Sequence, residues 1–446
     1  MIDISLESKL NSARLERSTL IGKVPPFRHP VLSDVDSYIR HVYLYSPIKP
    51  MRTGTADYFD LIITKLAACE IDRSCISIVV DDRFLDLLAL TKEMLGFQIV
   101  SYHEVPNFVR ANETRIFFLA NNEFHTYCFE SLSLSTKEDG GRIISVIHEP
   151  SCFMLMNNIS SNKKNGFDDS QLFLTMKHQF GAKAESIVTN RRDGNLDFDV
   201  EYVISAQGIA LEKSDEIWTH NFYSKLKLEL EGNGSNYPNI VVSSHPAFVP
   251  GAIKFPKSEI AVKRGGAYRI GMFGWVSQSK RVLSAIQAMA LVLQTLPADS
   301  HLNFELIVVG KLPSKNVYDP VSYASSLGIG GQVRFFDYVS SGEFEDLMES
   351  CDLLLNLRFP SCGETSGTLE RAVAGGIPVV TTAYQAFTEL PSSGHVSPFW
   401  PREIVQLFLL FYRLFHNEAP SLKAPKAEHA VEIIDLIFDE IISEKK

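Results

Sequence analysis

The sequence predicts an α/β protein built from two doubly wound sheets of mostly parallel strands. First, short β-branched runs alternate with helical segments along most of the chain, which is typical of parallel strands joined by helices. Second, a length of 446 residues accommodates two such domains of roughly 200 residues each. Third, within residues 353–380 a strand, a glycine-containing loop, a helix ending at Gly375-Gly376 and a second strand follow one another. That order is half of a parallel βαβ unit.

The elements divide into a tail, two domains and a C-terminal extension. Polar residues and prolines at the start predict a tail or short helix, the stretch 239–250 is interpreted as a linker, and the polar segment 157–200 is expected to be a helical insert. The four parts are residues 1–38, 39–250, 251–398 and 399–446. Strands are expected at 41–45, 75–80, 97–102, 115–119, 141–147 and 216–221, then at 268–274, 304–310, 333–339, 353–355 and 377–380. Helices are expected at 58–68, 84–95, 282–296, 344–350, 403–415 and 426–443.

The composition excludes several classes of protein. A formal net charge of −10 argues against a nucleic-acid-binding protein, which needs a basic face. The six cysteines form no CxxC pair, and no cluster of His, Cys and carboxylates has metal-ligand spacing. No run of about 20 apolar residues is long enough to cross a bilayer, and the N-terminus lacks the apolar core of a signal peptide. We therefore expect a cytoplasmic protein with reduced thiols.

The loop at 356–367 carries the most specific chemistry. It follows a strand and opens a helix, so its N–H groups face the carboxyl edge of the sheet and suit an anion such as phosphate. Glu364 lies beside that site, where a carboxylate repels phosphate but accepts hydrogen bonds from sugar hydroxyls. This combination points to glycan chemistry.

The loop also resembles that of a known family. Arg358-Phe359-Pro360, two residues, and then Gly-Glu-Thr-Ser-Gly at 363–367 are similar to a bacterial subgroup of the retaining glycosyltransferases of family four. The resemblance covers about residues 41 to 395 and implies the GT-B fold, two Rossmann-like domains facing a cleft. In the commoner form of the loop two glutamates are separated by seven residues. Here Gly363 and Arg371 stand at those places, with Glu364 and Glu370 each one position away, so the register of the carboxylates stays open.

In the first domain, the resemblance implies an acceptor-binding role. Gly54 lies in the loop that closes over donor and acceptor in the family, although most turn glycines are only structural. Asn121, Asn122 and His125 follow a strand and are assigned to the acceptor side, the alternative being residues that satisfy a turn. His148, at the tip of the next strand, faces the donor sugar in the family and is assigned as catalytic. Thr219 or His220 ends the last strand.

In the second domain, the resemblance implies nucleotide-sugar binding. Lys280 is set to neutralise the leaving diphosphate and is assigned as catalytic together with Glu364. Family members often carry Arg after the first glycine of this unit, where this chain has Trp275, and Arg281 is the candidate to compensate. A solvated surface pair is the alternative for Lys280 and Arg281. The other expected donor-binding residues are Gly54 in the first domain and, in the second, Gly274, Gly310, Thr365, Ser366, Gly367 and Glu370.

The helix predicted at 403–415 is apolar on nearly every side, so it must be buried against protein or lipid. We expect it to cross back onto the first domain, as in two-domain glycosyltransferases. The alternative is a peripheral contact with the inner face of a membrane.

These features lead to one function and two rivals. By resemblance, the protein moves a sugar from a nucleotide-sugar to a glycan, polysaccharide or lipid-linked acceptor with retention of configuration, with no cofactor and no metal. A dehydrogenase or epimerase using a dinucleotide lacks its GxGxxG motif here. A non-catalytic glycosyltransferase-like partner protein stays open because of the missing Arg and the shifted glutamates. The sequence does not give the donor sugar, the base, the acceptor or the oligomeric state.

Overall fold

The structure is a computed structural model that describes residues 38–85, 93–161, 168–232, 237–246, 268–297, 304–315, 318–416 and 431–443. The expected tail up to residue 37, most of the helix at 84–95 and residues 247–250 of the linker lie outside these residues. The chain forms two compact units, each described here by itself. The first unit comprises Met1–Pro246, Cys362–Glu364 and Glu428–Lys446, and the second comprises Ala247–Ser361 and Thr365–Ala427.

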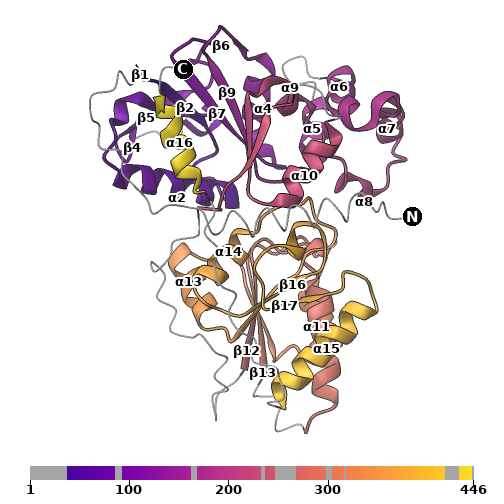
Figure 1. Cartoon of the computed structure of the whole chain (residues 1–446). Coiled ribbons are helices and arrows are strands. Elements are labelled where there is room, and N and C mark those ends of the chain that lie inside the picture. The colour runs from indigo at the N-terminus through magenta and orange to yellow at the C-terminus, as the bar shows by residue number, and fades with distance from the viewer. Residues whose placement is uncertain are drawn as a thin grey trace. The chain divides into compact units, whose positions relative to one another are not determined.

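The described residues of the first unit form an eight-stranded sheet (Figure 1). Neighbouring strands are parallel except at the β4–β5 edge. Along the chain, β2 is the first strand of this sheet. The strands β3 and β5 are then added on one side of it, and β7, β9, β10 and β11 on the other. β2 and β7 therefore flank a topological switch point, where open α/β sheets bind ligands. In spatial order the strands are β11 (Asn239–Val242), β10 (Glu216–Thr219), β9 (Arg142–Ile147), β7 (Glu113–Leu119), β2 (His41–Tyr45), β3 (Ile76–Val80), β5 (Phe97–Ser101) and β4 (Glu93–Met94).

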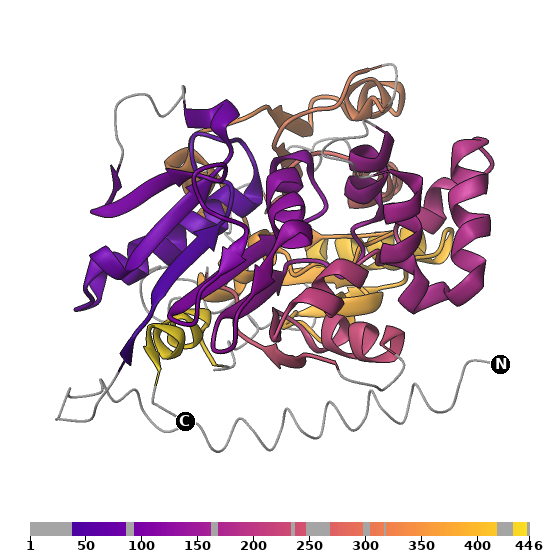
Figure 2. The same cartoon turned by 90° about the horizontal axis from the view of Figure 1, so that it is seen from above.

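Helices cover both faces of this sheet because alternate strand residues are buried on opposite sides. In β7, Ile116 and Phe118 join one apolar core, whereas Phe117 and Leu119 join the other. The first core contains α2 (Gly54–Ala68) and α16 (Ile433–Ile441), and Figure 2 shows α16 in yellow beside the indigo elements. The second core contains α4 (Thr126–Leu134), α5 (Phe153–Ser161), α6 (Asp169–Phe180), α7 (Ala184–Arg192) and α9 (Gly208–Lys213).

Shorter elements complete the first unit. α10 (Phe222–Glu231) connects β10 to β11. Two small ladders pair β1 (Tyr38–Ile39) with β18 (Ile442–Ser443) and β6 (Phe108–Val109) with β8 (Thr136–Lys137). The remaining α-helices are α3 (Asp82–Leu85) and α8 (Phe198–Glu201).

The second unit has a six-stranded parallel sheet in the order β14-β13-β12-β15-β16-β17. Numbered along the chain, this is the doubly wound order 3-2-1-4-5-6, with the switch point between β12 and β15. The strands are β12 (Tyr268–Phe273), β13 (Phe304–Val309), β14 (Val333–Phe336), β15 (Leu353–Asn356), β16 (Val379–Thr382) and β17 (Gly394–Val396). The α-helices are α11 (Val282–Gln294), α12 (Pro320–Ser326), α13 (Ser341–Glu349), α14 (Gly367–Ala374) and α15 (Arg402–Phe415).

Several expected elements differ from the structure, including the helix expected at 426–443, which as α16 ends at Ile441 and is followed by strand β18. Part of the expected linker, Asn239–Val242, is strand β11, which extends the first sheet because its backbone pairs with β10. Glu93–Met94 is a strand that pairs with β5, so the helix expected at 84–95 does not reach its predicted end.

The prediction that the helix at 403–415 crosses back onto the first domain is wrong. α15 packs on α11 within the second unit, where its buried face joins that unit's core. The helix that belongs to the first unit is the last one, α16, whose isoleucines pack against α2 and β2. Among the described residues, no helix combines the length and apolar character needed to span a bilayer.

Candidate functional site

The second unit brings two loops together at its switch point. The loop after β12 contains Gly274 and the short 3-10 helix Gln278–Lys280, and the loop after β15 contains Phe359. The N–H of Phe359 donates to the carbonyl oxygen of Ser279 at 2.8 Å, which ties the loops to each other. Two residues predicted for donor binding, Gly274 and Lys280, therefore lie where the doubly wound fold places ligand sites.

Lys280 lies directly against Gly274. Its Nζ donates to the carbonyl oxygen of Phe273 at 3.2 Å. A Cβ atom at Gly274 would lie only 2.4 Å from Nζ and 3.6 Å from Oγ1 of Thr368, and Gly274 has a φ of +92°. The backbone angle therefore favours glycine here, and a Cβ atom at this position would displace the Lys280 ammonium. The structure thus gathers Lys280, Gly274 and Thr368 at one point of the strand edge.

Glycine at position 310 is required by the close approach of the Gly274 backbone. A Cβ atom at this position would lie 2.3 Å from the carbonyl oxygen of Gly274, and its φ is +143°. The N–H of Gly274 in turn donates to the carbonyl oxygen of Val309 at 2.9 Å. Gly310 lets the ends of β12 and β13 approach closely, so it shapes the turn that holds Lys280.

Helix α14 points its N-terminus toward the same edge. Ser366 is its N-cap and accepts a hydrogen bond from the N–H of Leu369 at 3.4 Å, and Gly367 is the first helical residue, with Thr365 just before the cap. The first N–H groups of a helix have no partner within the helix and carry partial positive charge. Glu370, in the first turn, is buried, whereas Arg371 lies over the ring of Phe344 at 5.6 Å. Glu370 therefore places a carboxylate on the buried side of α14.

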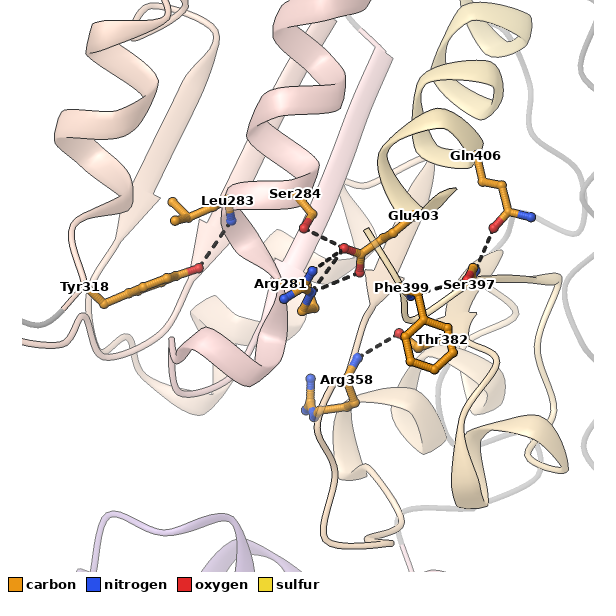
Figure 3. A network of polar contacts seen from close by, with 10 residues as sticks. All are labelled: Arg281, Leu283, Ser284, Tyr318, Arg358, Thr382, Ser397, Phe399, Glu403 and Gln406. Atoms are coloured by element: carbon orange, nitrogen blue, oxygen red, sulfur yellow. Dashed lines mark hydrogen bonds and ion pairs between the residues drawn. The ribbon is translucent and has the colours of Figure 1, made fainter. Parts of the chain in front are cut away.

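The guanidinium of Arg281 forms an ion pair with a buried carboxylate. Arg281 has a left-handed φ of +58°, and its guanidinium donates to Glu403 of α15 through Nε at 3.1 Å and Nη2 at 2.7 Å. Glu403 is fully buried and also accepts a hydrogen bond from Oγ of Ser284 at 2.7 Å (Figure 3). The structure gives Arg281 a bidentate ion pair that joins α11 to α15, a contact that was not expected for a donor-binding residue.

The boundary between the two units falls within the Gly-Glu-Thr-Ser-Gly motif, directly after Glu364. The three residues Cys362–Glu364 belong to the first unit, whereas Thr365 and the following residues belong to the second. Oε2 of Glu364 accepts a hydrogen bond from the N–H of Cys362 at 2.9 Å. This contact folds the glutamate back on its own loop.

The first unit gathers three histidines around Tyr58 and a fourth beside one of them. The ring of Tyr58 contacts His148 edge-on at 4.4 Å between centroids and lies 5.0 Å from His245, and its hydroxyl lies 2.8 Å from Nε2 of His220. His148 and His220 lie 5.7 Å apart, at the ends of β9 and β10, and His125 lies 6.1 Å from His148. This histidine cluster consists of His125, His148, His220 and His245.

Three members of the histidine cluster, His125, His148 and His220, are held as neutral rings. Burial lowers the pKa of His125 and of His220 to about 4. Burial also lowers the pKa of His148 well below its usual value, and the neighbouring histidines lower it further. Nε2 of His148 is buried and makes no hydrogen bond to any residue that the structure describes. A neutral imidazole with one nitrogen in that position is able to donate or accept a hydrogen bond.

His125 is bonded on both sides. Its Nδ1 lies 2.8 Å from the carbonyl oxygen of Phe118, which only accepts, so Nδ1 carries the proton and Nε2 accepts from Oγ1 of Thr55 at 2.8 Å. Thr55 is the second residue of α2, directly after Gly54. The ring is completely buried, so His125 anchors the first turn of α2 instead of presenting a nitrogen to solvent, and Gly54, expected in a loop, is the first residue of that helix.

The side chains of Asn121 and Asn122 each accept a hydrogen bond from a backbone N–H group. Oδ1 of Asn121 accepts from the N–H of Leu155 in the first turn of α5 at 2.9 Å, and Oδ1 of Asn122 accepts from the N–H of Phe124 at 3.2 Å. Gly54 differs from Gly274 because a Cβ atom there would meet nothing within 4 Å. The neighbourhood of Gly54 therefore imposes no steric requirement for glycine.

Several residues at these edges were not singled out from the sequence. Thr368 sits one residue past the glycine of the motif, and Tyr58 and His245 reach the histidine cluster from α2 and from beyond β11. Glu403 pairs with Arg281 from 122 residues away. Only Tyr58 had a local signal, since it closes the Gly-x-Ala-Asp-Tyr phrase. Among the described residues, no group of three or more His, Cys, Asp or Glu side chains is placed to hold a metal ion.

The two Rossmann-like units, each with a doubly wound parallel sheet, define the GT-B class of α/β fold. Residues 267–404 match the family model described as "Glycosyl transferases group 1", and this region contains Gly274, Lys280, Gly310 and the 365–370 segment. No curated protein matches the sequence.

Solved structures resemble the chain at low sequence identity. One is Anabaena HepE in complex with UDP and glucose, with 12% identity, a TM-score of 0.52, and coverage of 91% of this chain and 96% of that one. Another is a sucrose-phosphate synthase from Thermosynechococcus elongatus, with 12% identity, a TM-score of 0.50, and coverage of 85% and 90%. A putative UDP-N-acetylglucosamine 2-epimerase from Listeria monocytogenes has 10% identity, a TM-score of 0.50, and coverage of 92% and 98%. These similarities establish the shared fold.

Proposed function

We propose that this protein is a retaining glycosyltransferase that moves a sugar from a nucleotide-sugar donor to a glycan, polysaccharide or lipid-linked acceptor. The observation that carries the proposal is the convergence of Lys280, Thr368 and the N-terminus of α14 at the switch point of the second sheet. This convergence lies inside the region that matches the glycosyltransferase group 1 model. It supplies positive charge and hydrogen-bond donors at a place suited to a diphosphate.

In this proposal the second unit stabilises the leaving group. Negative charge grows on the diphosphate as the bond to the sugar breaks, and preorganised donors lower the energy of that transition state. The Lys280 ammonium acts as a point charge, while the first N–H groups of α14 donate hydrogen bonds. Because these groups supply the charge, we propose that the reaction needs no metal and no cofactor.

Carboxylates and the histidine cluster are assigned to the sugar. Glu364 or Glu370 accepts hydrogen bonds from donor-sugar hydroxyls, with Glu364 as the first choice. His148 is kept neutral by burial, and its unbonded Nε2 is suited to a sugar hydroxyl. His125 acts as a positioning residue on the acceptor side, because it holds the first turn of α2, which begins at Gly54.

The test is a screen of UDP-, GDP- and TDP-sugars for nucleotide release and sugar transfer, run with and without EDTA. The complex of HepE with UDP and glucose makes UDP-glucose the first donor to try. We expect one donor class to be hydrolysed slowly without acceptor, and EDTA to leave the rate unchanged. Absence of turnover and binding for every donor would support the non-catalytic alternative, and a strict requirement for Mg²⁺ or Mn²⁺ would reject the metal-independent mechanism.

An epimerase is the second candidate because the putative 2-epimerase matches the fold as well as the sucrose-phosphate synthase does. The same screen separates the two functions. A transferase releases the nucleoside diphosphate, whereas conversion of the donor to an epimer without sugar transfer or hydrolysis would favour the epimerase.

A further inference from the structure

The outer face of α15 carries exposed apolar and basic side chains. Its buried side faces the core of the second unit through Ile404, Leu407, Phe411 and Leu414. The opposite side, together with the turn before the helix, forms what we call the α15 face. This face consists of Phe399, Trp400, Arg402, Val405, Leu409 and Arg413.

The spacing of these residues makes the α15 face continuous. Positions 402, 405, 409 and 413 recur every three or four residues, so they lie along one side of the helix. Val405 is 52% exposed and Leu409 is 42% exposed. The turn adds Phe399 at 62% and Trp400 at 68%, which makes Trp400 the most exposed large apolar side chain among the described residues. Such exposure of a tryptophan is costly in water unless a partner covers it.

The turn that presents the aromatic pair is held in place. Figure 3 shows Oε1 of Gln406 on α15 accepting the N–H of Ser397 at 2.6 Å, while Oγ of Ser397 accepts the N–H of Phe399 at 3.3 Å. The Arg281–Glu403 ion pair fixes the first turn of α15 to α11. Phe399 and Trp400 therefore lie in a turn that hydrogen bonds hold against α15, and α15 is in turn fixed to α11.

The charge of the α15 face is of one sign. Between residues 397 and 416 the charged side chains are Arg402, Glu403 and Arg413, and Glu403 is buried against Arg281. The adjacent helix α11 has no charged residue from 282 to 294, and its Leu291 is 39% exposed. In a chain with a formal net charge of −10, the described residues 397–416 and 282–294 of this surface expose two arginines and no acidic side chain.

We propose that the α15 face binds the surface of an anionic lipid bilayer. Interfacial helices combine Trp, Phe and Leu side chains, which enter the headgroup boundary, with arginines that meet lipid phosphates. Arg402 and Arg413 supply the charge complementarity, and Trp400 suits the boundary because its ring is apolar with one polar N–H. The inference is independent of the proposed reaction.

The test uses the full-length protein and large unilamellar vesicles. The chain contains Trp218, Trp275 and Trp400, so Trp275→Phe leaves one buried and one exposed tryptophan. We expect a blue shift of tryptophan emission and co-sedimentation with vesicles containing phosphatidylglycerol, and neither with pure phosphatidylcholine. Absence of binding to the anionic vesicles would overturn the proposal.

Charge reversal localises the contact. Arg402→Glu with Arg413→Glu should lower the partition coefficient on anionic vesicles about tenfold or more. Arg110→Glu with Arg192→Glu is the matched control, since it changes the net charge equally at exposed arginines of the first unit. Equal losses in the two double variants would show non-specific electrostatics and reject the α15 face. A concentration-dependent dimer in wild-type protein that Trp400→Ala dissociates would instead assign the face to a second copy of the chain.

Discussion

The hydroxyl of Tyr58 on α2 lies 2.8 Å from Nε2 of His220, which follows β10. Nδ1 of His220 lies 3.3 Å from the carbonyl oxygen of Ser243, which only accepts, so Nδ1 carries the proton and Nε2 accepts from Tyr58. The same tyrosine ring packs edge-on against His148. Tyr58 therefore donates to His220 through its hydroxyl, while the Ser243 carbonyl sets the tautomer of that ring, and it positions His148 through its own ring.

These two contacts predict different effects for two substitutions of Tyr58. Tyr58→Phe should cost about 1–3 kcal/mol of unfolding free energy, because His220 loses its buried donor, while kcat/KM stays within a few-fold. Tyr58→Ala should also remove the ring beside His148 and lower kcat/KM much further. Chemical denaturation and steady-state kinetics measure the two effects. An equal loss of kcat/KM in both variants would show that the hydroxyl, and not the ring, supports the activity.

The histidine cluster predicts a loss of stability in acid. His125 and His220 have pKa values lowered to about 4 in the folded protein, against 6.5 in an unfolded chain. The unfolded state therefore binds more protons below pH 6.5, and stability present above that pH is lost as the pH falls toward 4. The slope is at most about 1.4 kcal/mol per pH unit for each histidine.

Glu149 acts in the opposite direction, since burial raises its pKa to about 8 and its contribution to stability falls as the pH rises from 4.5 to 8. The comparison is therefore between variants and not within the wild type. His220→Gln should show a smaller decrease in unfolding free energy between pH 6.5 and 4.5 than the wild-type protein does. Parallel pH profiles for the two proteins would remove His220 from the explanation.

Gly274 and Gly328 provide a matched pair of glycine substitutions. Both have positive φ, +92° and +74°, but a Cβ atom at Gly274 meets the Lys280 ammonium, whereas one at Gly328 meets nothing within 4 Å. Each change to alanine should cost roughly 1–2 kcal/mol of stability through the backbone. Only Gly274→Ala should also lower kcat/KM, because it displaces Lys280. Equal activity in the two variants would indicate that the position of Lys280 does not matter.

Glu364→Gln separates a sugar contact from a helix-terminal carboxylate. If the carboxylate accepts hydrogen bonds from donor hydroxyls, worth about 1.5–3 kcal/mol each, kcat/KM should fall tens-fold or more. The affinity for the free nucleoside diphosphate should hardly change, because that ligand has no sugar. Equal weakening of both ligands would assign Glu364 to the phosphate loop. No effect on either would move the sugar contact to Glu370.

The sequence was sufficient to predict most strands of the two sheets, because these are buried runs of apolar residues bounded by turns. The short edge strands β4 and β17 were not predicted. β2, β9 and β12 begin within one residue of their expected starts. β11 was missed because its four residues adjoin a proline-rich stretch, and pairing with β10 makes them a strand. The side of α15 that is buried was also not predictable, since its apolar residues occupy more than one face and packing on α11 selects among them.

The sequence predicted which strand ends carry the candidate site, but it did not predict the hydrogen-bond partners of individual side chains. Gly274 and Lys280 were expected together and lie together. For Arg281 and His125, the residue type was compatible with substrate binding, but the structure pairs each with a protein group distant in sequence, Glu403 and Thr55. Such long-range pairs leave no local pattern that a single sequence reveals.

Lys280→Ala tests the central claim most directly, because Lys280 is the proposed charge on the leaving diphosphate. With the donor found in the screen, kcat/KM should fall by about 30- to 1,000-fold, corresponding to about 2–4 kcal/mol of lost transition-state stabilisation. Thermal unfolding should be unchanged, and Lys225→Ala on the surface of α10 should retain wild-type kinetics. If Lys280→Ala is folded and turns over the donor at the wild-type rate, the site at the switch point of the second sheet is not where the leaving group is stabilised.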